Sequence, residues 1–290
     1  MVKLFADTAS LSEIGYCFGR EVHDGITTNP KIIEASGDLS TGFEGACKKI
    51  LAAHPNVPVS LETDFGGLEI RTVHDEPARV KELLLQQARK LASWGGNVVV
   101  KIPICEGGLE AVKELSRAGI KTNVTACMTP YQALEAVKCG ATYVSLFANR
   151  MLDSHILELA GYTLGLILEG DEWKSVVKAN QDLAETAWGL TLGEIAYVAQ
   201  ELDRGQTELI IGSIRSPADM QRIARAAPQV ITVPHKIVQG LTDVPALKNQ
   251  RREIIPENVN LGFSLRHPMT DYTLAEFERA AVAYRKSGAS

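Results

Sequence analysis

Short apolar runs alternate with helical segments along almost the whole chain, and this alternation limits the possible folds more than any other feature. The runs are rich in β-branched and other apolar residues and mostly lack polar alternation, which is typical of parallel strands buried on both faces. There are eight of them, at residues 4–6, 25–27, 57–61, 97–102, 122–126, 142–147, 208–212 and 229–233.

Helix-starting signals follow several of these runs. The spacing from Ser10 to Glu13 is that of a capping box, which predicts a helix directly after the first run. Asn29-Pro30, Thr129-Pro130 and Ser216-Pro217 each set a capping side chain before a proline suited to the first helical turn. An apolar stripe over residues 80–94 predicts the longest clear helix, which ends at the following glycine pair.

Regular strand and helix alternation implies right-handed crossovers within one parallel sheet. Eight units favour an α/β fold, a single closed (β/α)8 barrel of the TIM type. A doubly wound open sheet is the alternative, but no GxGxxG follows any run. We assign residues 1–245 to the barrel domain and 246–290 to a C-terminal extension with a helix near 274–286. Residues 151–206 predict a helical insertion after the sixth strand.

Composition excludes several protein classes. With 45% hydrophobic and 22% charged residues, the chain has the composition of an ordinary folded domain. A net charge of -5 argues against binding to nucleic acid or to an anionic membrane, and no uncharged apolar stretch reaches membrane-spanning length. Five cysteines without CxxC spacing, and an N-terminus without a signal peptide, favour a cytoplasmic location.

Sequence motifs for metals and nucleotides are missing as well. The chain contains no HExxH pattern, no GxxxxGK[ST] loop and no GxSxG elbow. We therefore expect no metal and no cofactor.

Polar residues stand at the carboxyl end of nearly every run, where barrels of this kind gather their active sites. A single polar residue at a strand end is expected simply because strand ends meet water. An active site is indicated by the fact that nearly every strand ends in a polar residue. They are Asp7, Thr28 and Asn29, Glu62, Lys101, Thr125, Ser145 with Arg150, and Ser213 with Arg215.

Lys101 follows four residues of a strongly apolar run. Burial favours the neutral amine, which is a nucleophile able to form an imine with a carbonyl; a side chain that reaches the rim is the alternative. Asp7 and Glu62 could transfer protons beside such an imine. Alternatively, Asp7 caps the first helix and Glu62 only pairs with Lys101.

Two arginines indicate an anion site. The guanidinium groups of Arg150 and Arg215 can bind a phosphate bidentately, and Ser213 adds a hydroxyl donor. Salt bridges are the alternative for both arginines, and a helix cap is the alternative for Asn29.

Four segments together resemble the transaldolase family, including its fructose-6-phosphate aldolase branch. They are Phe5-Ala6-Asp7-Thr8-Ala9, Gly25-Ile26-Thr27-Thr28-Asn29-Pro30, Val99-Val100-Lys101-Ile102-Pro103 and Tyr143-Val144-Ser145-Leu146-Phe147-Ala148-Asn149-Arg150. Gly212-Ser213-Ile214-Arg215 is similar to a later phosphate motif of the family. The matches run in order from residue 5 to about residue 240.

The resemblance implies a cytoplasmic enzyme of carbohydrate metabolism that moves a dihydroxyacetone unit from a ketose phosphate to an aldose phosphate. The donor would be sedoheptulose 7-phosphate or fructose 6-phosphate. Lys101 would form the imine, Asp7 would exchange the proton of the C4 hydroxyl, and Glu62 with Thr125 would move protons through a bound water. The sugar would be held by Asn29, Thr28 and Ser145, and its phosphate by Arg150, Ser213 and Arg215.

The sequence leaves several alternatives open for the exact activity of the protein. The aldolase branch has Gln and Tyr where this chain has Glu62 and Phe147, so the resemblance favours a transaldolase over an aldolase. A specialised sugar substrate remains open, because the chain length matches neither standard size class of the family. A noncatalytic sugar-phosphate binder is the other alternative. Members of the family form homo-oligomers, and we expect the same here.

Overall fold

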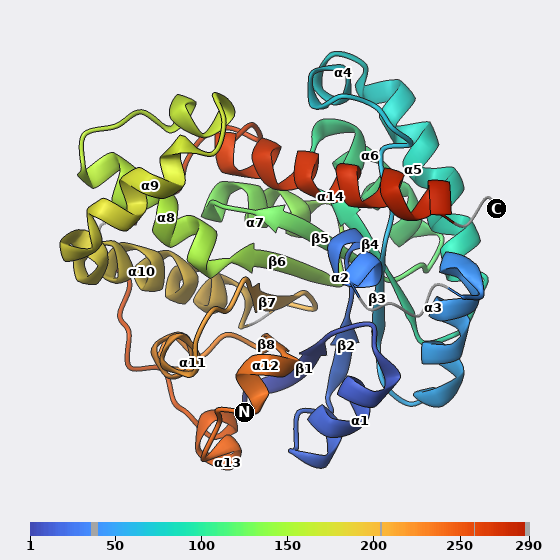
Figure 1. Ribbon diagram of the computed structural model, residues 1–290, viewed down its shortest axis with the longest axis horizontal. Helices are drawn as coiled ribbons and strands as arrows, with labels where there is room; N and C mark the ends of the chain where they lie inside the picture. The colour runs from blue at the N-terminus through green and yellow to red at the C-terminus, as the bar shows by residue number, and fades with distance from the viewer. Residues whose placement is uncertain (36–39, 204, 258, 288–290) are drawn as a thin grey trace.

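Eight parallel strands close into a barrel in which each strand pairs with the next in sequence and the last pairs with the first. The computed structural model describes residues 1–35, 40–203, 205–257 and 259–287. The strands are β1 (Lys3–Asp7), β2 (Gly25–Thr27), β3 (Val59–Glu62), β4 (Val98–Pro103), β5 (Thr122–Cys127), β6 (Tyr143–Phe147), β7 (Glu208–Gly212) and β8 (Val230–Pro234). The predicted (β/α)8 barrel is confirmed, and Figure 1 shows the strands enclosed by helices.

Helices follow every strand of the barrel. Those before the insertion are α1 (Leu11–Gly19), α2 (Pro30–Ala35), α3 (Gly42–Ala53), α4 (Ile70–Asp75), α5 (Pro77–Ala92), α6 (Glu106–Arg117) and α7 (Pro130–Lys138). The connection from β6 to β7 holds α8 (Ala148–Leu159), η1 (Leu164–Leu168), α9 (Glu172–Ala179), η2 (Gln181–Leu183) and α10 (Ala184–Leu202). The last helices are α11 (Pro217–Ala224), α12 (His235–Val238), α13 (Val244–Lys248) and α14 (Pro268–Ser287). The predicted helical insertion after the sixth strand is therefore confirmed.

Helix caps form at three of the four predicted positions. The side chains of Asn29, Thr129 and Ser216 each accept a backbone N–H three residues ahead. At the start of α1, Ser10 is the N-cap residue but makes no side-chain cap bond, and Glu13 instead accepts a hydrogen bond from Thr8. The capping box predicted there was wrong, although the helix does begin at the predicted place.

Two other helix predictions need correction. Helix α5 has 16 residues, whereas α10 has 19 and α14 has 20, so the apolar stripe at 80–94 did not mark the longest helix. Helix α14 also begins six residues before the predicted start at Leu274. Its first turns carry Thr270, Asp271 and Thr273, which weaken the apolar periodicity that the prediction used.

The barrel interior is apolar at its amino-terminal end. Phe5, Tyr143, Ile210 and Val230 form a separate cluster there, with the rings of Phe5 and Tyr143 6.0 Å apart. A Cβ at Gly25 would lie 2.6 Å from the Phe5 ring. Glycine is thus required at the start of β2 because a phenylalanine fills the space beside it.

The next interior layer is polar. Residues two apart on a strand face the same side, so Asp7, Ser145 and Thr232 lie one step beyond the apolar cluster. These side chains bond to neighbours on other strands: Thr27 donates to Asp7 and pairs with Thr232, and Ser145 donates to Asn123. The carboxyl-terminal half of the barrel is therefore lined by hydrogen-bonding groups.

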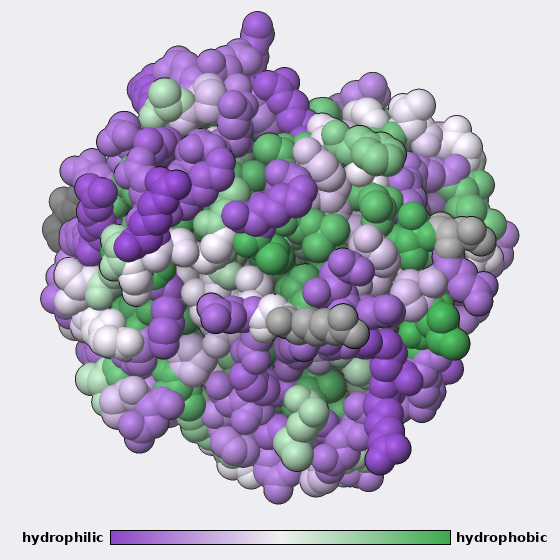
Figure 2. All heavy atoms as spheres, turned by 180° about the vertical axis from the view of Figure 1, so that it is seen from behind, coloured by the Kyte–Doolittle hydropathy of each residue, from purple (hydrophilic) through white to green (hydrophobic). Residues whose placement is uncertain are grey.

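The main core lies outside the barrel, between the strands and the surrounding helices. Leu4 and Ala6 of β1, for example, belong to the same buried cluster as Ile14 and Cys17 of α1. On the face turned away in Figure 1, hydrophilic residues cover most of the area and hydrophobic ones gather near the centre (Figure 2). None of the described helices is long and apolar enough to cross a membrane.

Helix α14 lies across the carboxyl end of the barrel. Thr270 donates to the carbonyl of Ala126 in β5, and Glu278 accepts the backbone N–H of Phe65 after β3. Figure 1 shows α14 starting beside the insertion and running toward the C-terminus, and it contacts both η1 and α2. The tail thus covers the end of the barrel where the sequence predicts the site.

Candidate active site

A cavity of about 290 Å³ opens at the carboxyl end of the barrel, beneath α14. Most of the predicted site residues line it: Asp7, Asn29, Lys101, Ser145, Phe147, Arg150 and Ser213. The other four predicted residues, Thr28, Glu62, Thr125 and Arg215, do not line it. Thr28 and Glu62 instead contact Lys101.

The ammonium group of Lys101 is buried between two oxygens. Its Nζ donates to the carbonyl of Thr28 at 3.0 Å and lies 3.2 Å from Oε2 of Glu62. Only 5% of the Lys101 side chain and 1% of the Glu62 side chain are exposed. Glu62 thus pairs with Lys101, and the Lys101 side chain does not reach the rim.

Burial sets the protonation of both carboxyl groups near Lys101. It raises the pKa of Glu62 to about 7, although the charge of Lys101 acts in the opposite direction. Burial also raises the pKa of Asp7, against the effects of Lys101 and the hydrogen bond from Thr27. Asp7 does not occupy the capping position of α1, which belongs to Ser10. Glu62 is thus able to exchange a proton near neutral pH, and burial shifts Asp7 in the same direction.

The hydroxyl of Thr125 is buried and has no hydrogen-bond partner among the described residues. Thr125 pairs with Pro103 in register and faces the same side of β5 as Asn123, the partner of Lys101. A buried hydroxyl without a partner is unfavourable, so this position suits a water or a substrate atom.

Both predicted anion-binding arginines are paired with carboxylates. Arg150 donates to Glu276 of α14 at 2.6 Å, and Arg215 holds both oxygens of the buried Asp153 in α8. Both arginines therefore form ion pairs with carboxylates of this chain. Asn29 likewise caps α2 through a 2.9 Å bond from the N–H of Ile32 while lining the cavity.

The loop after β7 is held by two residues that the sequence did not single out. Ser213 has a φ of 62°, a left-handed conformation that is costly for a residue with a Cβ. Its carbonyl accepts a bond from Asn149 at 2.8 Å, and Asn149 also donates to Asp219. Asp219 in turn accepts the backbone N–H groups of Arg215 and Ser216. Strain held by such a network is typical of functional loops.

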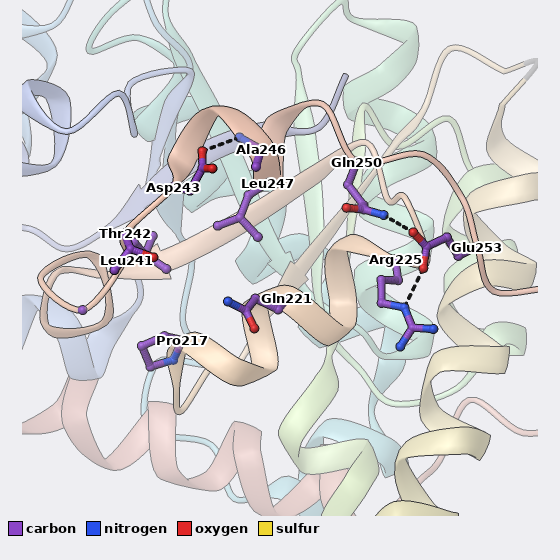
Figure 3. Close-up of a pocket in the computed structure, with 11 residues that line it drawn as sticks. Pro217, Gln221, Arg225, Leu241, Thr242, Asp243, Ala246, Leu247, Gln250 and Glu253 are labelled. Carbon is purple, nitrogen blue, oxygen red and sulfur yellow. Dashed lines mark hydrogen bonds and ion pairs between the residues drawn. The ribbon is translucent and has the colours of Figure 1, made fainter.

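A second cavity, about 370 Å³, lies between α11 and α13 and contains none of the predicted residues. Within it Arg225 and Gln250 both donate to Glu253, and the carboxylate of Asp243 accepts the backbone N–H of Ala246 (Figure 3). The candidate active site is therefore the cavity that holds Lys101.

Comparison with known proteins identifies the family. The model of the Transaldolase/Fructose-6-phosphate aldolase family matches residues 4–287. The chain belongs to this family.

Curated relatives of the transaldolase family are similar over most of the chain. A "Probable transaldolase" of Bdellovibrio bacteriovorus is 34% identical over 245 residues, which cover 84% of this chain and 91% of the relative. Proteins with the same name from Clostridium botulinum (32% identical) and Anaeromyxobacter sp. (29% identical) match 84% of the chain and 92% and 90% of their own lengths. The chain is thus a transaldolase-family enzyme.

Several residues of this transaldolase-family site escaped the sequence analysis. Lys31 follows Asn29-Pro30 directly and lines the cavity, so its place beside a strand end was an available signal. Phe277 lines the cavity and lies with its ring 6.3 Å from that of Phe147. No local pattern marked Phe277 or Glu276, because only the packing of α14 brings them to the barrel.

Proposed function

We propose that this protein is a transaldolase that transfers a dihydroxyacetone unit through an imine on Lys101. The observation that carries the proposal is the buried Lys101 at the base of the cavity, with Asp7 and Glu62 as partners for proton transfer. The membership of the family and the "Probable transaldolase" relatives support the same activity.

The reaction begins when the neutral amine of Lys101 attacks the C2 carbonyl of a ketose phosphate. Glu62 and Thr125, through a water, move the protons needed for that oxygen to leave as water and for the imine to be protonated. Asp7 then takes the proton of the C4 hydroxyl, and the bond between C3 and C4 breaks. Its electron pair forms the C2–C3 double bond of an enamine, which neutralises the iminium nitrogen. The aldose phosphate leaves as an aldehyde.

Transfer is completed by the reverse steps on a second aldose phosphate. The enamine carbon C3 attacks the acceptor aldehyde, Asp7 returns its proton to the new hydroxyl, and water hydrolyses the imine to release the new ketose. Asn29 and Ser145 hold the dihydroxyacetone hydroxyls, with Phe147 against the carbon chain of the sugar, while the buried Thr28 acts only through its carbonyl bond to Lys101. Arg150, Ser213 and Arg215 bind the phosphate, which suits sedoheptulose 7-phosphate or fructose 6-phosphate as donor.

Reductive trapping tests the imine. Borohydride added with fructose 6-phosphate should leave a stable adduct, which peptide mass spectrometry should assign to Lys101. Lys101→Met should lose both the adduct and turnover, whereas Lys48→Met, at an exposed lysine, should keep both. Turnover by Lys101→Met would overturn the mechanism. Phosphate binding without any adduct in the unmodified protein would indicate a noncatalytic binder.

A second measurement separates transfer from aldol cleavage. Product formation from fructose 6-phosphate should depend on added erythrose 4-phosphate. Rapid release of glyceraldehyde 3-phosphate without an acceptor would instead indicate an aldolase.

A further inference from the structure

A carboxylate from the tail helix is bound at the mouth of the active-site cavity. One oxygen of Glu276 accepts a hydrogen bond from Arg150 at 2.6 Å, and the other lies 3.0 Å from the ammonium of Lys31. Both cations line the cavity that contains Lys101. The carboxylate of Glu276 therefore already binds Arg150 and Lys31, the two cations that an incoming anionic substrate would meet.

The contact is more enclosed than an ordinary surface salt bridge. Arg150 and Glu276 are each 16% exposed, and the guanidinium also lies over the ring of Tyr272, 5.6 Å from its centroid. Burial alone would raise the pKa of Glu276, but the bonds from Arg150 and Lys31 outweigh it and lower that pKa. The group is consequently an anion at neutral pH.

The salt bridge of Arg215 differs from that of Arg150 in where its carboxylate comes from. Its partner Asp153 lies on α8, directly after the strand that carries Ser145, and is almost fully buried. Glu276 comes from the C-terminal helix, and its own side chain is partly exposed. If Glu276 leaves its partners, its carboxylate can reach water, whereas Asp153 would remain as a buried charge without a partner.

We infer that Glu276 competes with the substrate's phosphate for Arg150 and Lys31, and so sets how tightly the enzyme binds phosphorylated sugars. A phosphate and the carboxylate cannot share these two donors without bringing like charges into contact. Binding requires Glu276 to move aside, after which Lys31 becomes a further ligand of the phosphate. The inference rests on the proposed function for the identity of the substrate, but not for the existence of the anion site.

Binding of inorganic phosphate to the full-length protein tests this inference without relying on turnover. Isothermal titration at pH 8 should show that Glu276→Gln binds phosphate about ten-fold more tightly than the unmodified protein, because the neutral amide does not compete for the cations. Glu276→Asp, with a shorter side chain, should fall between the two and provides a second variant if the first folds poorly. Adding Lys31→Met to Glu276→Gln should remove most of the gain.

Glu278→Gln is the matched control on the same helix. Its carboxylate binds the backbone N–H groups of Phe65 and Gly67, not the cavity cations, so its loss should lower stability and leave phosphate affinity unchanged. Unchanged or weaker phosphate binding by Glu276→Gln would overturn the inference, as would a failure of every variant to bind phosphate.

Kinetics distinguish this inference from the proposed function. For Glu276→Gln, the KM for fructose 6-phosphate should fall by about the same factor with kcat little changed, and the KM for unphosphorylated fructose should not change. If no variant turns over any ketose but the phosphate affinities differ as expected, the transaldolase proposal fails and the competition by Glu276 stands.

Discussion

Glu62 and Lys101 face each other in register on neighbouring strands β3 and β4, with their charged atoms 3.2 Å apart and both side chains almost fully buried. Such a pair loses the solvation of two charges, so it adds little to stability compared with apolar residues of the same size. Its value is chemical. It keeps a carboxyl group that can change protonation near pH 7 next to the amine proposed as nucleophile.

The raised pKa of Glu62 predicts a specific pH dependence of stability. In the folded protein its pKa is about 7, against an ordinary value of 4.5, so between these pH values the folded state holds a proton that the unfolded state has lost. The stabilisation from this group is therefore complete below pH 4.5 and is lost as pH rises through 7, at a slope of up to about 1.4 kcal/mol per pH unit.

Urea unfolding of the unmodified protein and of Glu62→Gln between pH 5 and 8 measures this slope. The difference in unfolding free energy should change steadily up to about pH 7 and then become constant. Glu44→Gln is the control, because Lys48 and Lys90 lower the pKa of Glu44, so its contribution changes only below pH 4.5. Equal slopes for the two variants would show that Glu62 does not titrate in this range.

Phe147 lines the cavity with its ring against Phe277, and it has no hydroxyl to orient a water. Phe147→Tyr should therefore let water protonate the enamine faster and raise the ratio of aldol cleavage to transfer by about ten-fold, a change of about 1.4 kcal/mol in relative barriers. The measurement is glyceraldehyde 3-phosphate release with and without erythrose 4-phosphate.

Phe147→Leu serves as the comparison, since it removes the ring without adding a hydroxyl. It should slow both reactions and keep their ratio. A similar shift toward cleavage in both variants would mean that packing, not the hydroxyl, controls the fate of the enamine.

Ser213 combines a side chain proposed to bind phosphate with a left-handed backbone. Ser213→Ala and Ser213→Gly both remove the hydroxyl, so each should raise the KM for the sugar phosphate several-fold. Only glycine relieves the strain, although it also makes the unfolded chain more flexible. We expect the glycine variant to match or exceed the alanine variant in unfolding free energy, by up to about 1 kcal/mol. Thermal unfolding would decide this, and a less stable glycine variant would contradict it.

Features that depend on local pattern could be predicted from the sequence. All eight strands follow from apolar runs, and the strand-end rule found Asp7 and Lys101 because the barrel brings those ends together. Thr28 was predicted to bind the sugar, but its contact with Lys101 is made by its backbone carbonyl, a group that every residue type possesses.

Features that depend on tertiary packing could not be predicted. Glu276 and Phe277 lie on a helix far along the chain, and nothing in the periodicity of α14 indicates which residues face the cavity. Asn149 lies within a segment that resembles the family, but its bond to the carbonyl of Ser213 depends on how β6 and β7 sit side by side.

Phe5 and Gly25 connect the fold to the site, because the Phe5 ring belongs to the apolar cluster that lies one step below Asp7. Gly25→Ala would bring a methyl group within 2.6 Å of that ring, which must then move. We expect a loss of about 1–3 kcal/mol in unfolding free energy from overpacking.

Gly15→Ala is the control: it lies in a helix with open space around the added methyl, so it should be neutral or stabilising. Combining Gly25→Ala with Phe5→Leu should cost less than the sum of the two single changes, since the smaller side chain makes room for the methyl. Additive losses, measured by urea unfolding, would show that Phe5 is not what requires glycine at this position.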